Sequence, residues 1–529
     1  MDKYTVFRDA LSINKSDKLC EKGFLMTNGN VNNTLPEYIK EWNHTDLSGF
    51  SFYIHPKQFL YYMESDNDIY FLIGHAYNPY TNCIDEQEIL SEWINAEKKG
   101  KEEALDYVNS ITGLYLMGKI SHNIISVMLD CAGMMGGYYG VLGNNVIITS
   151  HTVLAAELFN LEPTEYVNEL LNYKFYSLYG SFLPGDITPY NDVYRIVPNT
   201  IVVIDCENFK TKVKRFYPNA ELKKVTTEEE YEKQIERIAS VFQNTMELIS
   251  KKWKKPAISL TGGMDSKTTL AAANGNYDKF YYFSYITSKA EQLDAEAANK
   301  ICGEIGINHK IYEISPQPQD YSNFENTKNI LQYNKDYIGK SNTNDICKRI
   351  FFEDTEDFDV EVKSWVSEIA RANYYKKFGK KKMPKKISPR RCSSMYKIFL
   401  HNRSLLHKTD KVFEEYINKT DLKNNIFNFD WSDLFLWEIR YGAWGGLVIT
   451  SEHKYSFDIT IPYNNRKLLE LMLAVPLEKR RKDILHNDLI KYMNQKIFDT
   501  GITIVNLNET KFREFCEKCY FNINTFLPF

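Results

Sequence analysis

The first 215 residues alternate short apolar runs with polar turns, a pattern that predicts β-strands. Runs rich in Ile, Val, Phe and Tyr occur at residues 49–54, 70–73, 124–129, 146–148 and 201–204. Strand-forming residues at this spacing, with a few helices between them, indicate a layered α+β domain. We therefore expect a first domain over residues 1–215.

The pattern changes near Pro218, where apolar residues begin to recur at helical spacing. Thr227 and Glu230 form a capping-box sequence, so one long amphipathic helix is predicted over residues 228–252. Strand-like runs then alternate with helical segments; the runs lie at 257–260, 280–285 and 310–312 and the helices at 266–274 and 290–305. This alternation predicts an α/β domain with a parallel sheet over residues 228–529, with its ligand beyond the carboxyl ends of the strands.

Between the first of these strands and its helix stands the sequence Ser-Leu-Thr-Gly-Gly-Met-Asp-Ser. Two adjacent glycines allow a tight turn with inward N–H groups, and the helix N-terminus that follows favours a polyanion. It is not the common P-loop, whose lysine is missing. We predict that the loop binds ATP, which is split at its α/β bond, with Mg²⁺ held by Asp265. The candidate nucleotide-binding residues are Ser259, Leu260, Thr261, Gly262, Gly263, Asp265 and Ser266.

Composition narrows the classes of partner. A net charge of −4 and a pI near 6.3 do not favour nucleic acid, which calls for a basic face. No stretch approaches the roughly 18 apolar residues of a membrane span, and the start of the chain has no secretory signal, so we expect a cytoplasmic protein without a membrane partner. Nine cysteines without regular spacing indicate reduced thiols, and the lone pair Cys516 and Cys519 is interpreted as incidental.

Residues 376–391 contain nine basic residues and no acidic one. The plain interpretation is a solvated, mobile loop. The alternative is a lid or docking strip for an anionic substrate.

The glycine loop, placed behind a long helix and after a β-rich domain, resembles the SGGxDS motif of the asparagine synthetase family, which includes β-lactam synthetases and lasso-peptide cyclases. The loop departs only by Thr261, which keeps the hydroxyl of the usual serine. The resemblance covers nearly the whole chain. It implies a class II glutamine amidotransferase-like domain, an Ntn-hydrolase-like β-sandwich with helices, followed by a synthetase domain of the adenine nucleotide α-hydrolase-like PP-loop fold. It also implies an AMP-forming ligase that adenylates a carboxylate for attack by an amine.

The N-terminal domain departs further from that family. Glutamine-hydrolysing members expose an N-terminal cysteine as nucleophile, whereas residue 2 here is Asp2. The segment from Gly74 to Asn78 lacks the Asn-Gly pair of the family's oxyanion element, and the internal Cys20, Cys83 and Cys131 carry no free α-amine. We therefore expect no glutaminase activity. The nitrogen would come from an amine in the substrate or from ammonia, for which a separate protein is one source.

The resemblance implies three further site residues. The segment 363–372 occupies the place of the second synthetase motif, with Glu368 as a candidate catalytic residue and second metal ligand and with Ser364 and Ser367 at altered positions. Glu438 stands where β-lactam synthetase has its catalytic glutamate, and it is the candidate for orienting or deprotonating the amine; a purely structural role is the alternative. Lys511 resembles a lysine that binds the departing pyrophosphate.

Three acyl substrates are compatible with this hypothesis: aspartate or a sugar acid with free ammonia, a small molecule that closes a lactam, or a peptide. A different class of function is a catalytically degenerate protein that binds a nucleotide and regulates a partner. It is motivated by Asp2, Ser364 and Ser367, which all depart from catalytic residue types. Transfer chemistry on tRNA is a third and weaker alternative, because neither a basic domain nor paired catalytic cysteines accompany the loop.

Overall fold

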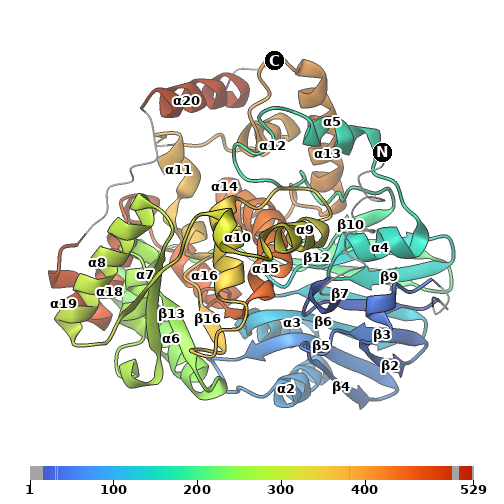
Figure 1. Cartoon of the computed structure of the whole chain (residues 1–529), viewed down its shortest axis with the longest axis horizontal. Coiled ribbons are helices and arrows are strands. Elements are labelled where there is room, and N and C mark those ends of the chain that lie inside the picture. The colour runs from blue at the N-terminus through green and yellow to red at the C-terminus, as the bar shows by residue number, and fades with distance from the viewer. Residues whose placement is uncertain (1–15, 30, 32–33, 381, 503–510, 527–529) are drawn as a thin grey trace.

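The first half of the chain is a sandwich of two antiparallel sheets (Figure 1). The computed structural model describes residues 16–29, 31, 34–380, 382–502 and 511–526. One sheet has the order β10 (Val193–Arg195), β8 (Tyr138–Leu142), β9 (Asn145–Thr149), β1 (Phe24–Thr27), β3 (Phe50–Ile54), β2 (Asn43–Leu47). The other has the order β12 (Lys210–Arg215), β11 (Thr200–Asp205), β7 (Ile124–Leu129), β6 (Thr112–Ser121), β5 (Asp68–Tyr77), β4 (Leu60–Ser65). Four of the five predicted runs lie within strands β5, β7, β9 and β11, and the run 49–54 begins one residue before β3.

The two sheets bury one face of each strand against the other sheet, because alternate side chains of a strand point to the same side. Phe52 of one sheet meets Phe71 of the other with ring centroids 5.2 Å apart. Helices α2 (Glu86–Lys99) and α3 (Lys101–Ser110) cover the outer face of the second sheet. Helix α4 (Thr152–Phe159) packs on β9 of the first sheet, and α5 (Glu165–Leu171) comes next in the chain. The layered α+β domain that the sequence predicts is therefore present.

The second half contains a five-stranded parallel sheet. Its order is β15 (Lys310–Glu313), β14 (Tyr281–Ile286), β13 (Pro256–Ser259), β16 (Val360–Val362), β17 (Asp458–Thr460). The long helix α6 (Glu228–Lys252) leads into it and carries the expected capping box of Thr227 and Glu230. Helix α7 (Met264–Ala272) follows β13, packs with α6 and α18 (Ile484–Met493), and α8 (Lys289–Ile305) packs on β14. The predicted parallel sheet with covering helices is confirmed.

Strand β13 lies at the point where the chain order of the sheet reverses. From β13 the next strands, β14 and β15, extend to one side, whereas β16 and β17 extend to the other. At such a switch point the loops after two neighbouring parallel strands diverge and leave a crevice at the carboxyl edge. The glycine loop after β13 and the segment after β16 border that crevice.

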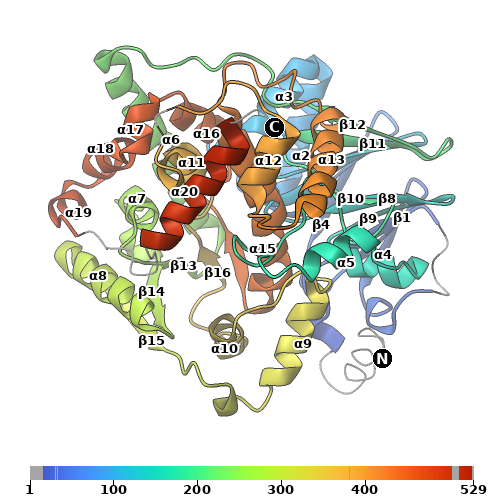
Figure 2. The ribbon, with the colours of Figure 1, turned by 90° about the horizontal axis from the view of Figure 1, so that it is seen from above.

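A helical layer completes the second half (Figure 2). Helices α12 (Pro389–Tyr396), α13 (Arg403–Lys419) and α20 (Lys511–Phe526) pack together. The remaining helices are α9 (Phe324–Asn334), α10 (Thr343–Phe351), α11 (Asn373–Lys377), α14 (Trp431–Phe435), α15 (Gly446–Ser451), α16 (Arg466–Leu473), α17 (Leu477–Arg481) and α19 (Gln495–Asp499). Between α14 and α15 runs a π-helix, η6 (Leu436–Gly445). Its hydrogen bonds join residues five apart, a form that is rare and frequently occurs at functional sites.

Buried polar side chains join the two halves. The amide of Asn464 donates to the Asp130 carboxylate at 2.8 Å and to the Gly113 carbonyl at 2.6 Å. Arg466, which is fully buried, donates through Nε to Asn199 at 2.9 Å. Because such groups are costly to bury without partners, they fix the relative position of the halves.

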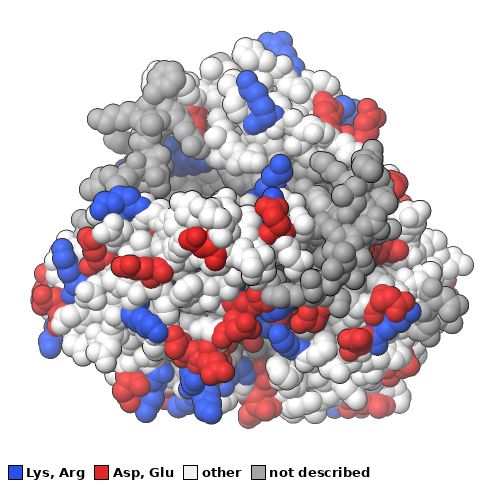
Figure 3. Space-filling model, viewed as in Figure 1, with Lys and Arg blue, Asp and Glu red and all other residues white. Residues whose placement is uncertain are grey.

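The described parts of the basic segment 376–391 are held at both ends rather than being a free loop. Lys376 pairs with Asp483 at 2.5 Å, and Arg390 pairs with Asp410 at 2.7 Å. Charges of both signs are interspersed over the face of the molecule in Figure 3, as far as that face is described. Within the described part of the chain, no helix has both the length and the apolar character needed to cross a membrane.

Candidate active site

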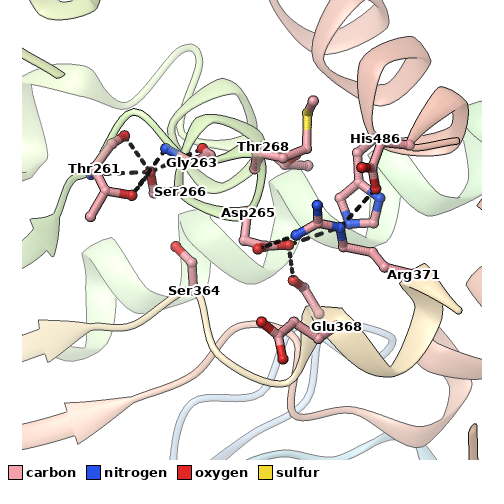
Figure 4. A network of polar contacts seen from close by, with 12 residues as sticks. Thr261, Gly263, Asp265, Ser266, Thr268, Ser364, Glu368, Arg371 and His486 are labelled. Atoms are coloured by element: carbon pink, nitrogen blue, oxygen red, sulfur yellow. Dashed lines mark hydrogen bonds and ion pairs between the residues drawn. The ribbon is translucent and has the colours of Figure 1, made fainter. Parts of the chain in front are cut away.

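The glycine loop connects the end of β13 to the start of α7. Leu260 continues the parallel ladder, because its N–H donates to the Phe283 carbonyl at 2.8 Å. The helix begins at Met264 with Gly263 as its N-cap, two residues earlier than the sequence suggests. Ser266 therefore lies inside the first turn, where its hydroxyl donates to the Thr261 carbonyl at 2.7 Å and accepts the Thr261 N–H at 3.1 Å (Figure 4). These bonds fold the loop back over the helix N-terminus.

The loop already holds a carboxylate oxygen. The N–H of Gly262 donates to Oδ1 of Asp294, on α8, at 3.2 Å, and the N–H of Gly263 donates to the Thr261 hydroxyl at 3.1 Å. Burial raises the pKa of the Asp294 carboxyl. A backbone turn that donates N–H groups to a carboxylate can also donate them to a phosphate. The first N–H groups of α7 are further donors at the same place.

Asp265 lies at the centre of a charged network. Its carboxylate accepts the Ser367 hydroxyl and the Arg371 guanidinium, with Arg371 Nη1 at 2.5 Å from Oδ2. Arg371 also bonds Asp483 through Nε at 2.8 Å. Burial alone would lower the pKa of Arg371, but Asp265 and Asp483 raise it above its ordinary range. The buried His486 lies 3.9 Å from Asp265 Oδ1, and burial lowers its pKa to about 4, so it is neutral at pH 7.

The segment after β16 meets the loop from the neighbouring strand. The Ser364 hydroxyl lies 2.8 Å from that of Thr269 on α7. Val366, fully buried, has a φ of 77°. A β-branched residue in the left-handed region is strained, and such strain gathers at functional sites. A short 3₁₀-helix, η5 (Ser367–Arg371), then presents Ser367, Glu368 and Arg371 to the loop.

These elements surround a cavity of about 360 Å³. Figure 4 shows Ser364, Asp265 and Glu368 around this space. Glu368 accepts the Tyr441 hydroxyl at 3.2 Å, and burial, followed by the charge of Asp265, raises its pKa. The lining residues are Ser259, Thr261, Gly263, Asp265, Ser266, Tyr285, Lys363, Ser364, Trp365, Glu368, Arg440, Tyr441 and Trp444.

Several lining residues escaped the sequence analysis. Arg440, Tyr441 and Trp444 all lie on the π-helix η6, which no simple hydrophobic period predicts. Trp365 follows β16 and stacks on Trp444 with ring centroids 5.2 Å apart. The sequence does carry a signal for these lining residues, because aromatic residues and Arg440 cluster around Glu438. The sequence analysis predicts only Glu438 from this cluster as a site residue.

Glu438 is not among the residues that line this cavity, and its contacts favour the structural alternative. It is fully buried, and both carboxylate oxygens are bound by Arg215, with Oε1 at 2.5 Å from Nη1 and Oε2 at 2.9 Å from Nη2. Oε2 also accepts the Tyr416 hydroxyl at 2.6 Å, and Oε1 accepts the Asn199 amide at 3.2 Å. A carboxylate so fully committed has no free lone pair directed at a substrate amine. Lys511 begins α20, but its side chain lies outside the described part of the structure.

The residues present do not fit a magnesium site in this arrangement. Both oxygens of Asp265 are occupied by Ser367 and Arg371, and Ser367 stands where an aspartate ligand would be needed. Within the described residues, no group of three or more His, Cys, Asp or Glu side chains could hold a metal ion. A positive guanidinium against Asp265 opposes a divalent cation at the same carboxylate.

Comparisons with known proteins do not place the chain in a family. No family model matches the sequence, and no curated protein does either. Among solved structures, one described as the allosteric regulatory enzyme of purine biosynthesis is similar at 12% identity and a TM-score of 0.23, over 56% of this chain and 60% of that chain. Glutamine phosphoribosylpyrophosphate amidotransferase from B. subtilis, complexed with ADP and GMP, is similar at 10% identity and a TM-score of 0.21, over 58% and 61%. The chain thus spans about three fifths of these proteins. TM-scores of this size carry no argument about function, so the resemblance to asparagine synthetases stays a hypothesis.

Proposed function

We propose that the protein is an ATP-dependent ligase of the asparagine synthetase type, which joins a carboxylate to an amine and releases AMP and pyrophosphate. The observation that carries the proposal is the position of the loop from Ser259 to Ser266. It ends the central strand of a parallel sheet at its switch point and borders a cavity of about 360 Å³. Nucleotides bind at such points in open parallel sheets. On this proposal the second half is a PP-loop synthetase domain.

The loop suits the phosphates of ATP. A phosphate oxygen would take the place of the Asp294 carboxylate on the Gly262 N–H, and the N-terminus of the nine-residue helix α7 supplies further donors. In the first step, a carboxylate oxygen of the substrate attacks the α-phosphorus of ATP. The bond to the β-phosphate breaks, pyrophosphate leaves with the electron pair, and an acyl-adenylate remains.

In the second step an amine attacks the acyl carbon, the bond to AMP breaks, and the amine loses a proton. Two carboxylates line the cavity; Asp265 is paired with Arg371, and Glu368 is the one that can accept that proton. Its raised pKa makes it a better base than an ordinary glutamate. We assign this role to Glu368 in place of Glu438, which is bound to Arg215.

The first half would be a degenerate amidotransferase-like domain of the Ntn type, without glutaminase activity. At the position of the family's oxyanion element, the rings of His75 and Tyr77 pack against Trp253 at 5.0 and 5.9 Å between centroids. Aromatic side chains thus occupy the position at which the family has its Asn-Gly pair. This supports an amine of the substrate, or ammonia made elsewhere, as the nitrogen source.

A second candidate function is nucleotide binding without turnover, in a protein that regulates a partner. The ion pair between Asp265 and Arg371 favours it, because it occupies the carboxylate on which metal-dependent members of the family rely. Binding of ATP without any acid-dependent chemistry would support this alternative.

The experiment is exchange of labelled pyrophosphate into ATP in the presence of a panel of aspartate, β-amino acids, uronic acids, aryl acids and peptides. Reversible adenylation requires exchange that depends on one acid, and we expect Asp265→Asn to abolish it. Asp278→Asn is the matched control, because Asp278 is exposed and forms its ion pair with the neighbouring Lys279. ATP binding without exchange for any acid would contradict the ligase and favour the regulatory function.

A further inference from the structure

Arg440 is a half-buried cation held in one orientation at the cavity. Its guanidinium carbon lies 3.9 Å from the ring centroid of Trp444 and 5.6 Å from that of Phe182. Nη1 donates to the Tyr179 carbonyl at 2.5 Å. Two aromatic faces and one hydrogen bond fix the plane of the guanidinium, so little conformational entropy would be lost when it binds a ligand.

The charge of Arg440 is only partly balanced, because Glu368 lines the same cavity and favours the charged form but lies outside ion-pair distance. Among the described residues, no Asp or Glu forms an ion pair with Arg440, and its one hydrogen bond uses Nη1. Nε and Nη2 therefore keep their N–H groups, and the side chain lines the cavity. Burial lowers the pKa of Arg440, which shows that the site disfavours the charge in the absence of a partner. A desolvated guanidinium with two free parallel donors fits a planar oxyanion.

A buried lysine, Lys397, lies behind Arg440. Lys397 is fully buried, donates to the Gly180 carbonyl, and lies 4.7 to 4.9 Å from the ring centroids of Tyr176, Phe182 and Tyr396. Burial lowers its pKa, and the charge of Arg440 lowers it further. The two basic groups are close enough to repel, and an anion beside Arg440 would relieve that repulsion.

Residues of the N-terminal half of the chain hold the Arg440 side chain in place. The residues that hold it, from Tyr179 to Phe182, precede β10 and so belong to the first half. Gly180 has a φ of 86°, and a Cβ there would lie 2.6 Å from Arg440 Nη1 and 3.0 Å from Trp444. Only glycine allows the backbone to approach both side chains this closely.

The wall beside Arg440 is aromatic. Trp365 stacks on the Trp444 indole, with ring centroids 5.2 Å apart and an angle of 22° between the planes. Both indoles line the same cavity, as do Tyr285 and Tyr441. The apolar part of a ligand bound to Arg440 would lie against these rings.

We propose that Arg440 is the receptor for the carboxylate of an aromatic carboxylic acid, whose ring lies against the tryptophans. Adenylation of this acid rests on the proposed function. Binding of the acid at Arg440 does not depend on the proposed function. The glycine loop would take the phosphates of ATP, while Arg440 takes the acid. The first half of the chain then shapes the acid site of the second instead of supplying ammonia.

The test measures the binding of carboxylic acids in the absence of ATP. Binding is measured by calorimetry and by tryptophan fluorescence, since Trp365 and Trp444 line the site. The probes are phenylacetate and indole-3-acetate, compared with neutral phenylacetamide, ring-free acetate, phosphate and pyrophosphate. We expect Arg440→Gln to weaken the aryl carboxylates at least about tenfold, as expected for a charged hydrogen-bonded pair, and to leave phenylacetamide unchanged. Arg440→Lys should recover part of the affinity, because it keeps the charge but not the planar pair of donors.

Gly180→Ala tests whether the segment from Tyr179 to Phe182 positions the Arg440 side chain. We expect it to weaken the same carboxylates without changing pyrophosphate binding. Gly49→Ala is the matched control, since Gly49 has a φ of 82° but open space around its would-be Cβ, so it carries the backbone strain alone. Melting temperatures of all variants separate misfolding from a lost contact.

Three outcomes would overturn the proposal. One is that no aryl carboxylate binds at millimolar concentration. Another is that Arg440→Gln leaves carboxylate affinity unchanged. The third is that it weakens phosphate and pyrophosphate instead, which would make Arg440 a phosphate ligand. Carboxylate binding that depends on Arg440, without pyrophosphate exchange for any acid, would refute the proposed ligase and leave the receptor intact.

Discussion

Replacing Glu438 with glutamine separates a structural role from a catalytic one. In the folded protein the side chains of Glu438 and Arg215 are exposed by only 0% and 1%, and they form two hydrogen bonds with each other. Glutamine keeps the volume but removes the negative charge, so Arg215 would be left buried without a counter-ion. Breaking a buried ion pair from one side costs about 3–5 kcal/mol.

The loss should appear as a lower melting temperature. For domains of about 150–250 residues, 1 kcal/mol corresponds to roughly 2–4 °C, so Glu438→Gln should lower the midpoint by about 10 °C. Arg215 lies on β12 and Glu438 on η6, so the two halves lose a shared contact. Differential scanning calorimetry measures the change. The matched control is Glu229→Gln, which breaks an exposed i,i+4 pair with Lys233 and should cost about 0.5 kcal/mol or less.

The double variant Arg215→Met with Glu438→Leu checks the cause. Apolar residues of similar size remove both charges together, so its melting temperature should lie well above that of Glu438→Gln. The reasoning would be refuted if Glu438→Gln melted within about 1 °C of the unchanged protein. If that variant also lost acid-dependent pyrophosphate exchange, Glu438 would be catalytic after all.

Three further predictions follow from other parts of the structure. Arg371→Ala should tighten Mn²⁺ binding about tenfold in calorimetry, because it frees an oxygen of Asp265 from a guanidinium; unchanged affinity would mean that the ion pair does not exclude the metal. The buried carboxyl of Asp336 has a pKa raised to about 6 by burial, above its unfolded value of 3.8, so the folded state holds the proton more tightly and stability falls by up to about 3 kcal/mol as the pH rises from 4 to 6. Asp336→Asn should therefore melt above the unchanged protein at pH 8 and lose this advantage at pH 4; an equal difference at both pH values would refute the assignment. Gly446→Ala should destabilise the fold by about 1–3 kcal/mol, because its Cβ would lie 2.4 Å from a backbone carbonyl oxygen of the first half, whereas Gly303→Ala, in open space on α8, should not; equal melting temperatures would argue against this close approach.

The sequence was most informative where local rules suffice. The capping box of Thr227 and Glu230 placed helix α6 at Glu228–Lys252, as observed. Alternating strands and helices predict the parallel sheet. The sequence also places the glycine loop between a strand and a helix, which are β13 and α7 in the structure. These features depend on hydrogen bonds and side-chain periodicity within about 20 residues, so the chain carries them locally.

The candidate site was only partly predictable. Asp265 and Glu368 line the same cavity, which the sequence could suggest from their place in the two motifs. Residue type alone did not separate Glu368 from Glu438, because both are glutamates beside aromatic residues. Burial against Arg215, from strand β12 more than 200 positions away, gives Glu438 its structural role.

Local patterns in the chain therefore predict five strands of the first half, the helix Glu228–Lys252, three strands of the parallel sheet and the loop that borders the crevice. The tertiary structure decided which charges meet. Arg371 reaches Asp265 across 106 positions, and Arg440 meets the Tyr179 carbonyl across 261. Such pairings depend on how strands and helices pack in three dimensions, and the strength of each charge depends on burial and neighbours that no local pattern encodes.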